Sequence, residues 1–284
     1  MWLIKRFLVC VFLGSATFVQ AAETSAPPYG SNTEAGNTLK LSDTHLYYEI
    51  YGTGGPLLII HGNAGSLKDM ATQIAYFSKD HQVIAADSRG HGKSDLGKNT
   101  LTYEQIAADF IALLDHLELE KINVLGWSDG GIVGLHLAMK YPKRIQKLIA
   151  FGANLFAGEP AIYPWLKGPL AAWDSAISAG LNMDPKSAEW QLQRQHHDLL
   201  MKMTPITPAM LKSVKTPTLI IAADRDAITN YHTVDIFESL PNAHLAIMPG
   251  STHWAPMKLP SLFNGLVSDF LEKPFQRPTT RDEF

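Results

Sequence analysis

The 284-residue chain has almost no cysteine and no run of positive charge. Its single cysteine, Cys10, lies in an apolar N-terminal stretch, so the rest of the chain can form no disulfide and has no thiol chemistry. The formal net charge of −3 gives no reason to expect a nucleic-acid partner. We find no clustered metal-ligand spacing and no glycine-rich phosphate loop, so neither a metal nor an organic cofactor is expected.

The N-terminus is also short of apolar residues for a membrane span, because the stretch over residues 7–18 would not comfortably cross a bilayer. Lys5 and Arg6 precede this stretch, and small residues follow at Ala21 and Ala22. This pattern predicts a signal peptide over residues 1–22 and a periplasmic or secreted protein. A membrane-anchored protein with an uncleaved N-terminus is the alternative. Cleavage would change the net charge from −3 to −5.

The remaining chain alternates between buried strand patterns and helical patterns, which predicts an α/β fold. We expect a mostly parallel central sheet with helices on both faces. A flexible lead-in is expected over residues 23–35 and a C-terminal tail over 275–284. The core is assigned to 36–154 and 216–274. Residues 155–215 read as short, aromatic-rich helices, an inserted cap over the carboxyl ends of the strands. A helix over residues 102–119 would be capped by Thr102.

The run "NVLGWSDGGIVGLHLA" changes from a strand pattern to a helix pattern at Ser128. Glycines lie two residues to either side, at Gly126 and Gly130. Such a motif is common by chance, and a serine before a helix is an ordinary N-cap. A nucleophilic role would explain both glycines, because a side chain at either position would crowd a sharp bend that exposes the hydroxyl.

A serine hydroxyl needs a base, and the chain offers 11 histidines. His253 follows the strand pattern "HLAIMPG", so it should lie at the same sheet edge as Ser128. His91 is the main competitor. His196 and His197 fall in a predicted cap helix, where we expect them on the surface.

The base needs a carboxylate, and "LIIAADRDAI" places Asp224 and Asp226 at the end of a strand. We prefer Asp226 as the acid and expect the other carboxylate to form a turn. An oxyanion hole would need two backbone donors. The N–H of Asp129, at the start of a helix, is one candidate, and the N–H of Asn63 in "HGNAG" is the other.

Together these segments resemble the α/β-hydrolase family, from about Leu39 to Leu271. The segments that carry the resemblance are "HGNAG", "DSRGHGKSD", "GWSDGG", "AADRDAI" and "GSTHW". The resemblance implies a serine hydrolase that uses Ser128, Asp226 and His253 in that chain order. It also implies ester, thioester, amide or carbon–carbon bond hydrolysis without a cofactor.

The stretch from "GWSDGG" to "GAN" is similar to the valacyclovir hydrolase (biphenyl hydrolase-like) branch. That branch implies that Asp129 recognises the α-amino group of amino-acid esters. The alternative is that Asp129 only stabilises the N-terminus of its helix through the helix dipole. Trp127 and Trp165 are further candidate substrate contacts. The alternatives are a general carboxylesterase or lipase-like enzyme, an aminopeptidase or carbon–carbon hydrolase, and a catalytically inactive binding module. The sequence leaves the oligomeric state open.

Overall fold

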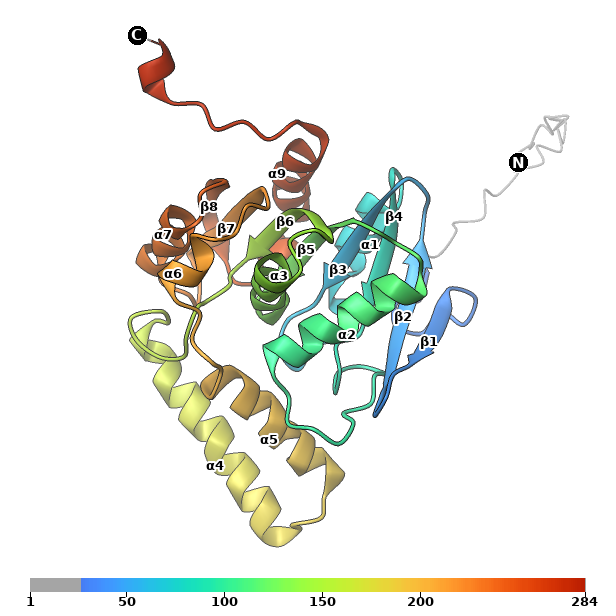
Figure 1. The fold of residues 1–284 in the computed structure, drawn as a ribbon. Helices are drawn as coiled ribbons and strands as arrows, with labels where there is room; N and C mark the ends of the chain where they lie inside the picture. Colours follow the sequence, from blue (N-terminus) through green and yellow to red (C-terminus); the bar gives the residue numbers. More distant parts are fainter. Residues whose placement is uncertain (1–26, 284) are drawn as a thin grey trace, which may run out of the picture.

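The computed structural model describes residues 27–283, so the predicted signal peptide lies outside the described residues. Its centre is an eight-stranded sheet in the order β1-β2-β4-β3-β5-β6-β7-β8 (Figure 1). Only the pairs β1–β2 and β2–β4 are antiparallel, which confirms the predicted mostly parallel sheet. The strands are β1 (Gly36–Lys40), β2 (His45–Tyr51), β3 (Gly55–Ile60), β4 (His81–Ala86), β5 (Ile122–Trp127), β6 (Ile145–Phe151), β7 (Thr218–Arg225) and β8 (Ala243–Thr252).

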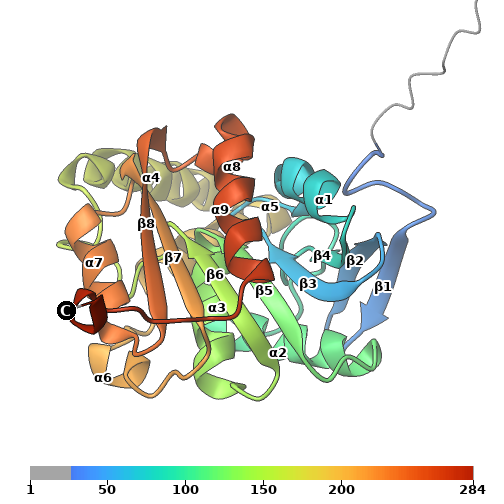
Figure 2. The ribbon, with the colours of Figure 1, turned by 90° about the horizontal axis from the view of Figure 1, so that it is seen from above.

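Helices cover both faces of this sheet, and each face has its own apolar core (Figure 2). The helices α2 (Tyr103–His116), α3 (Asp129–Lys140) and α7 (Asn230–Ser239) pack on one face. The other face is covered by η1 (Leu67–Met70), α1 (Ala71–Phe77), α8 (Ala255–Lys258) and α9 (Pro260–Glu272). Thr102 caps α2 as predicted, because its hydroxyl accepts a hydrogen bond from the N–H of Gln105.

The insert between β6 and β7 forms a helical hairpin at one end of the core (Figure 1). It contains η2 (Pro164–Leu166), α4 (Lys167–Met183), α5 (Ala188–Met201) and α6 (Pro208–Leu211). The expectation of only short helices is wrong here, since α4 has 17 residues and α5 has 14. The Trp190 ring lies against Gly180, so a large aromatic packs where the two helices meet. This ring belongs to the core of the cap.

The N-terminal end of the described chain packs on the core, whereas residues 276–281 near its other end are exposed. The backbone N–H groups of Gly30 and Asn32 donate to the buried carboxylate of Glu49 on β2. This part of the predicted flexible lead-in is therefore anchored. The C-terminal segment runs past β8 and ends in η3 (Thr280–Glu283) (Figure 2). Among residues 27–283, no helix combines the length and apolar character needed to cross a membrane.

Candidate active site

Ser128 lies between β5 and α3 with φ 56° and ψ −119°, a strained conformation for a residue with a side chain. A Cβ at Gly126 would lie 2.1 Å from the carbonyl oxygen of Gly130. A Cβ at Gly130 would lie 2.3 Å from the carbonyl oxygen of Ile60, at the end of β3. Only glycine fits at these two positions, as the sequence predicts. The bend presents the serine hydroxyl at the carboxyl edge of the sheet.

The Ser128 hydroxyl contacts a histidine and, through it, a buried carboxylate. Oγ of Ser128 lies 2.9 Å from Nε2 of His253, and Nδ1 of His253 lies 2.5 Å from Oδ1 of Asp226. A carboxylate accepts hydrogen bonds, so the proton of the neutral imidazole resides on Nδ1 and the Nε2 lone pair faces the serine. This arrangement can remove a proton from the hydroxyl and later return it.

Asp226 and Asp224 have different partners. The Asp226 carboxylate accepts N–H groups from Ala223, Ala227 and Ile228 in addition to the His253 ring. Burial acts to raise the pKa of Asp226, but the His253 ring and these backbone donors outweigh it and lower that pKa. Asp224 instead accepts the N–H groups of two residues near the end of β8. Asp226 is therefore the aspartate that orients His253.

The predicted oxyanion donors lie beside Ser128. A Cβ at Gly62 would lie 3.2 Å from Cβ of Ser128, so the loop after β3 packs directly on the bend. Within residues 27–283, neither the N–H of Asn63 nor that of Asp129 has a hydrogen-bond acceptor. Asp129 is the first residue of α3, where a free N–H and the helix dipole favour negative charge.

The side chains of Asn63 and Asp129 also meet. Nδ2 of Asn63 donates to Oδ2 of Asp129 at 2.8 Å. Burial raises the pKa of Asp129 to about 6, although Asn63, the neighbouring Tyr103 side chain and His253 act in the opposite direction. Oδ1 of Asp129 and the Tyr103 hydroxyl are both buried, and neither has a hydrogen-bond partner of good geometry.

The other candidate histidines have structural contacts. His91 is buried and its Nδ1 donates to the carbonyl oxygen of Arg89. His196 and His197 are buried too, so the expectation that they lie on the surface is wrong. The His196 ring stacks on the His91 ring at 4.2 Å, and its Nε2 donates to the carbonyl oxygen of Gly90. Helix α5 thereby docks on the loop after β4.

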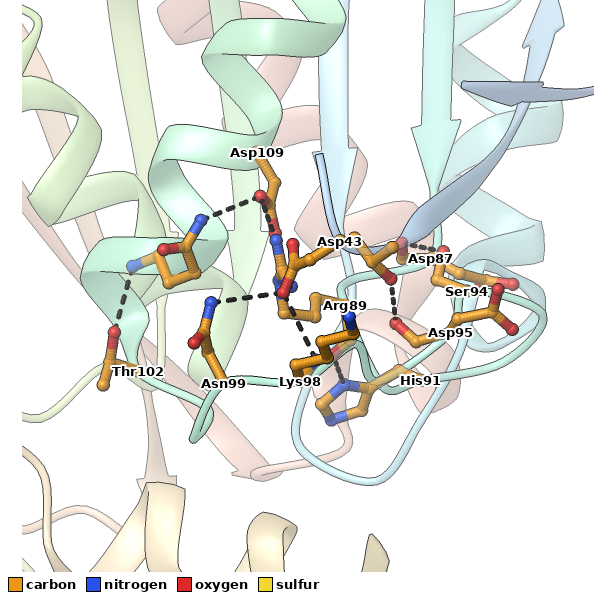
Figure 3. A network of polar contacts seen from close by, with 12 residues as sticks. Asp43, Asp87, Arg89, His91, Ser94, Asp95, Lys98, Asn99, Thr102 and Asp109 are labelled. Atoms are coloured by element: carbon orange, nitrogen blue, oxygen red, sulfur yellow. Dashed lines mark hydrogen bonds and ion pairs between the residues drawn. The ribbon is translucent and has the colours of Figure 1, made fainter. Parts of the chain in front are cut away.

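That loop, which contains "DSRGHGKSD", is fixed by a buried arginine (Figure 3). Arg89 is 1% exposed and forms a two-bond contact with Asp109 of α2 and a second ion pair with Asp43. Asp87 accepts the N–H groups of Leu67 and Lys93, which closes the loop on itself and on η1. The motif therefore supports the site from outside and contributes no group to the serine.

A cavity of about 110 Å³ opens at Ser128 and His253. Its only other polar lining residue is Asn154, whose Nδ2 already donates to the carbonyl oxygen of Phe156. The remaining lining is Ala157, Gly158, Ile162, Leu166, Leu170, Leu200, Met201, Ala227 and Ile228. Sequence reasoning did not single out these residues, because apolar side chains in a cap are ordinarily core.

The two tryptophans proposed as substrate contacts do not line this cavity. Trp127 is 5% exposed, and its indole N–H donates to the backbone carbonyl of His253 at 2.9 Å. The structure therefore gives it a positioning contact behind the histidine. Trp165 is 61% exposed. Asp129 is also outside the cavity lining, on the side toward Asn63.

Comparisons with known proteins agree with this geometry. A family model described as the alpha/beta hydrolase fold matches residues 55–212, so the chain belongs to the α/β hydrolase family. This confirms the resemblance stated from the sequence, and the protein is a hydrolase of this family.

Two curated relatives cover most of the chain. The chain is 29% identical to the serine hydrolase BPHL of Mus musculus, over 82% of this chain and 84% of that protein. It is 27% identical to a putative carbamate hydrolase RutD of Azorhizobium caulinodans, over 80% and 95%. The solved structure of MGS-M2, an alpha/beta hydrolase from a deep-sea metagenome library, superposes with a TM-score of 0.74 at 22% identity, over 86% of this chain and all of that one.

Among residues 27–283, no group of three or more His, Cys, Asp or Glu side chains is placed to hold a metal ion.

Proposed function

We propose that this protein is an exported serine hydrolase that cleaves carboxylic esters through an acyl-enzyme on Ser128. The observation that carries the proposal is the continuous contact from Oγ of Ser128 through the His253 ring to the buried Asp226 carboxylate. The left-handed backbone at Ser128 supports it, because such strain persists where the surrounding structure requires it.

In the proposed reaction, Oγ of Ser128 attacks the ester carbonyl carbon while Nε2 of His253 takes its proton. The carbonyl oxygen becomes an oxyanion, which the N–H groups of Asn63 and Asp129 would stabilise. Collapse of this intermediate breaks the carbon–oxygen bond to the alcohol, which leaves with the proton from His253. Water then attacks the acyl-enzyme by the same steps and releases the acid.

A fluorophosphonate probe tests the nucleophile. We expect stoichiometric labelling of Ser128 and loss of both labelling and p-nitrophenyl pentanoate hydrolysis in Ser128→Ala. Labelling of a different residue, or unchanged hydrolysis by Ser128→Ala, would overturn the proposal. A folded wild-type protein that neither reacts with the probe nor cleaves an ester would indicate the inactive binding module instead.

The cavity supports an uncharged, apolar acyl or alcohol group, because its lining holds no charged side chain apart from His253 when protonated. A cavity of about 150 Å³ holds a benzene ring, or roughly 25 Å³ for each carbon. On that scale the 110 Å³ at Ser128 would take a chain of about four carbons. This supports the general carboxylesterase alternative.

A series of p-nitrophenyl esters from acetate to decanoate tests the size limit. We expect the highest kcat/KM near pentanoate. Leu200→Ala removes a lining side chain and should move the maximum by about three carbons. Leu262→Ala, an exposed leucine on α9 outside the cavity, is the matched control and should leave the maximum unchanged. A chain-length profile that Leu200→Ala does not alter would contradict this assignment.

Amino-acid esters are a second candidate, favoured by the buried and unpartnered Oδ1 of Asp129 next to the nucleophile. The norvaline and pentanoate esters differ by one amino group and match the cavity in size. If Asp129 binds the ammonium, norvaline should be preferred tenfold or more, and Asp129→Asn should abolish the preference. The pKa of Asp129 is raised to about 6, so the carboxylate is protonated below that pH. The preference should therefore grow as the pH rises from 5 to 7.

Export is proposed from the N-terminal pattern alone. N-terminal sequencing of the protein from a periplasmic or culture fraction would test it, with cleavage after Ala21 or Ala22 as the expected result. An intact Met1 in the membrane fraction would support the uncleaved anchor.

A further inference from the structure

Asn63 and Asp129 are connected through their side chains as well as through their proposed backbone role. They come from different elements, the loop after β3 and the first turn of α3, and are 66 residues apart. Their side chains share a hydrogen bond of 2.8 Å, and Asp129 is 6% exposed. The pair therefore ties together the two segments that carry the proposed oxyanion donors.

The second N–H of the Asn63 amide group donates to the backbone carbonyl of His196 at 3.1 Å. Both hydrogens of this amide nitrogen are thus used, one toward the core and one toward helix α5 of the cap. The His196 ring itself is held by the carbonyl oxygen of Gly90. The cap consequently helps to fix the orientation of the Asn63 side chain.

The backbone of the loop around Asn63 is held mainly at the carbonyl of Gly62. It contains Gly62 and Gly65, and the residue between Asn63 and Gly65, Ala64, has a positive φ of 52°. Within residues 61–65 the backbone-to-backbone contact is the hydrogen bond from the N–H of Gly65 to the carbonyl of Gly62, at 3.2 Å. The same carbonyl accepts a hydrogen bond from Nδ1 of His61 at 2.7 Å, so the peptide that carries the Asn63 N–H is held at its carbonyl end. The side chain of Asn63 adds the link from this peptide to α3 and to the cap.

We propose that the Asn63–Asp129 side-chain pair, here called the clamp, is a positioning device that holds the two oxyanion donors at a fixed separation. The cap completes the clamp through the His196 carbonyl. This proposal rests on the proposed function of Ser128. It assigns Asp129 a role that needs a hydrogen-bond acceptor at Oδ2 and does not need a charge.

This distinction gives a sharp test, because an asparagine at position 129 can still accept the Asn63 N–H through its amide oxygen. Its NH₂ group would then face the Tyr103 hydroxyl, which can accept. Asp129→Asn therefore keeps the clamp, whereas Asp129→Ala and Asn63→Ala break it. Neither alanine removes a backbone N–H, so the donors themselves remain.

The assay is p-nitrophenyl pentanoate hydrolysis by the full chain. We expect kcat to fall about 10- to 100-fold in Asn63→Ala and in Asp129→Ala with KM changed less than twofold, because the clamp serves the transition state. Both substitutions remove the Asn63–Asp129 hydrogen bond, and Asn63→Ala also removes the bond to His196. The double variant should therefore be no more than about threefold less active than Asn63→Ala. Asp129→Asn should stay within about threefold of wild type. Affinity for a boronic acid that forms a tetrahedral adduct should fall in parallel with kcat.

Asn99→Ala removes an exposed amide that donates a hydrogen bond to Asp43, and it should leave kcat unchanged. Urea unfolding shows which variants are folded, and Asn63→Ser replaces Asn63→Ala if that variant is not. Losses that multiply in the double variant, losses confined to KM, or an Asp129→Asn variant as impaired as Asp129→Ala would overturn the clamp. Failure of the proposed function differs, because the wild-type protein would then cleave no ester or Ser128→Ala would retain full activity.

Discussion

Gly152, directly after β6, limits where the His253 ring can lie. Its φ is +62°, and a Cβ there would lie 2.7 Å from Cε1 and 2.9 Å from Nδ1 of His253. An ordinary contact begins near 3.4 Å, so Gly152→Ala must displace the ring or the backbone by about 0.7 Å. Nε2 of His253 is 2.9 Å from the Ser128 hydroxyl, so a shift of this size removes their alignment.

The backbone strain of such a substitution can be separated from the effect on the ring. Gly250 has nearly the same φ, +63°, and a Cβ there meets nothing within 4 Å. Each alanine should lower the free energy of unfolding by about 1–2 kcal/mol, the cost of a left-handed conformation. Only Gly152→Ala should also lose activity, by about 100-fold in kcat, because misplacement by about 1 Å costs this much.

The comparison requires kcat and KM for p-nitrophenyl pentanoate and urea unfolding of both variants. We expect Gly250→Ala to keep kcat within twofold of wild type. Equal activity losses in the two variants would mean that backbone strain alone is responsible. Full activity in Gly152→Ala would show that the position of the His253 ring does not limit the reaction.

Three further substitutions probe neighbouring contacts. Oδ1 of Asp226 accepts two N–H groups and the His253 ring, whereas Oδ2 accepts one N–H group. Asp226→Asn should therefore keep its amide oxygen on His253 and preserve the histidine tautomer. It should lower kcat about 10²- to 10³-fold, less than Ser128→Ala. Trp127→Phe removes the donor to the His253 carbonyl and should lower kcat about tenfold with KM unchanged. Lys147 is buried, and its ammonium group donates to three backbone carbonyls at the end of α9. Lys147→Met should therefore lower the free energy of unfolding, measured in urea, by about 2–4 kcal/mol. Lys121 is exposed, and Lys121→Met should leave this free energy unchanged.

The core could be predicted from the sequence because its signals are local. Short apolar runs identify β5 and β6, and the Thr102 cap marks the start of α2. In a parallel sheet the carboxyl ends of the strands lie at one edge. Residues that follow different strands, such as Ser128 and His253, therefore meet without any pairwise signal in the sequence.

The docking of the cap could not be predicted in this way. His196 is polar and lies on a helix whose other residues are largely polar, which is the pattern of an exposed face. Its burial depends on Gly90, 106 residues earlier, and on the stacked ring of His91. The anchored lead-in has the same cause, because the carboxylate that binds Gly30 belongs to Glu49. Contacts between residues so far apart in the sequence leave no periodic pattern in either segment.

Substrate choice was the hardest property to predict, because residue type does not say which face of the cap meets the serine. Tryptophan is a common binding residue, yet Trp165 is exposed and Trp190 packs against Gly180 within the cap. The residues that reach the cavity are leucines such as Leu170 and Leu200, which the sequence offers equally as cap core. On the proposed function, the elbow and the sheet edge would determine which atoms react, while the cap side chains that line the cavity would determine which acyl chain can enter. A change at Leu200 should therefore alter the preferred ester without altering the reaction.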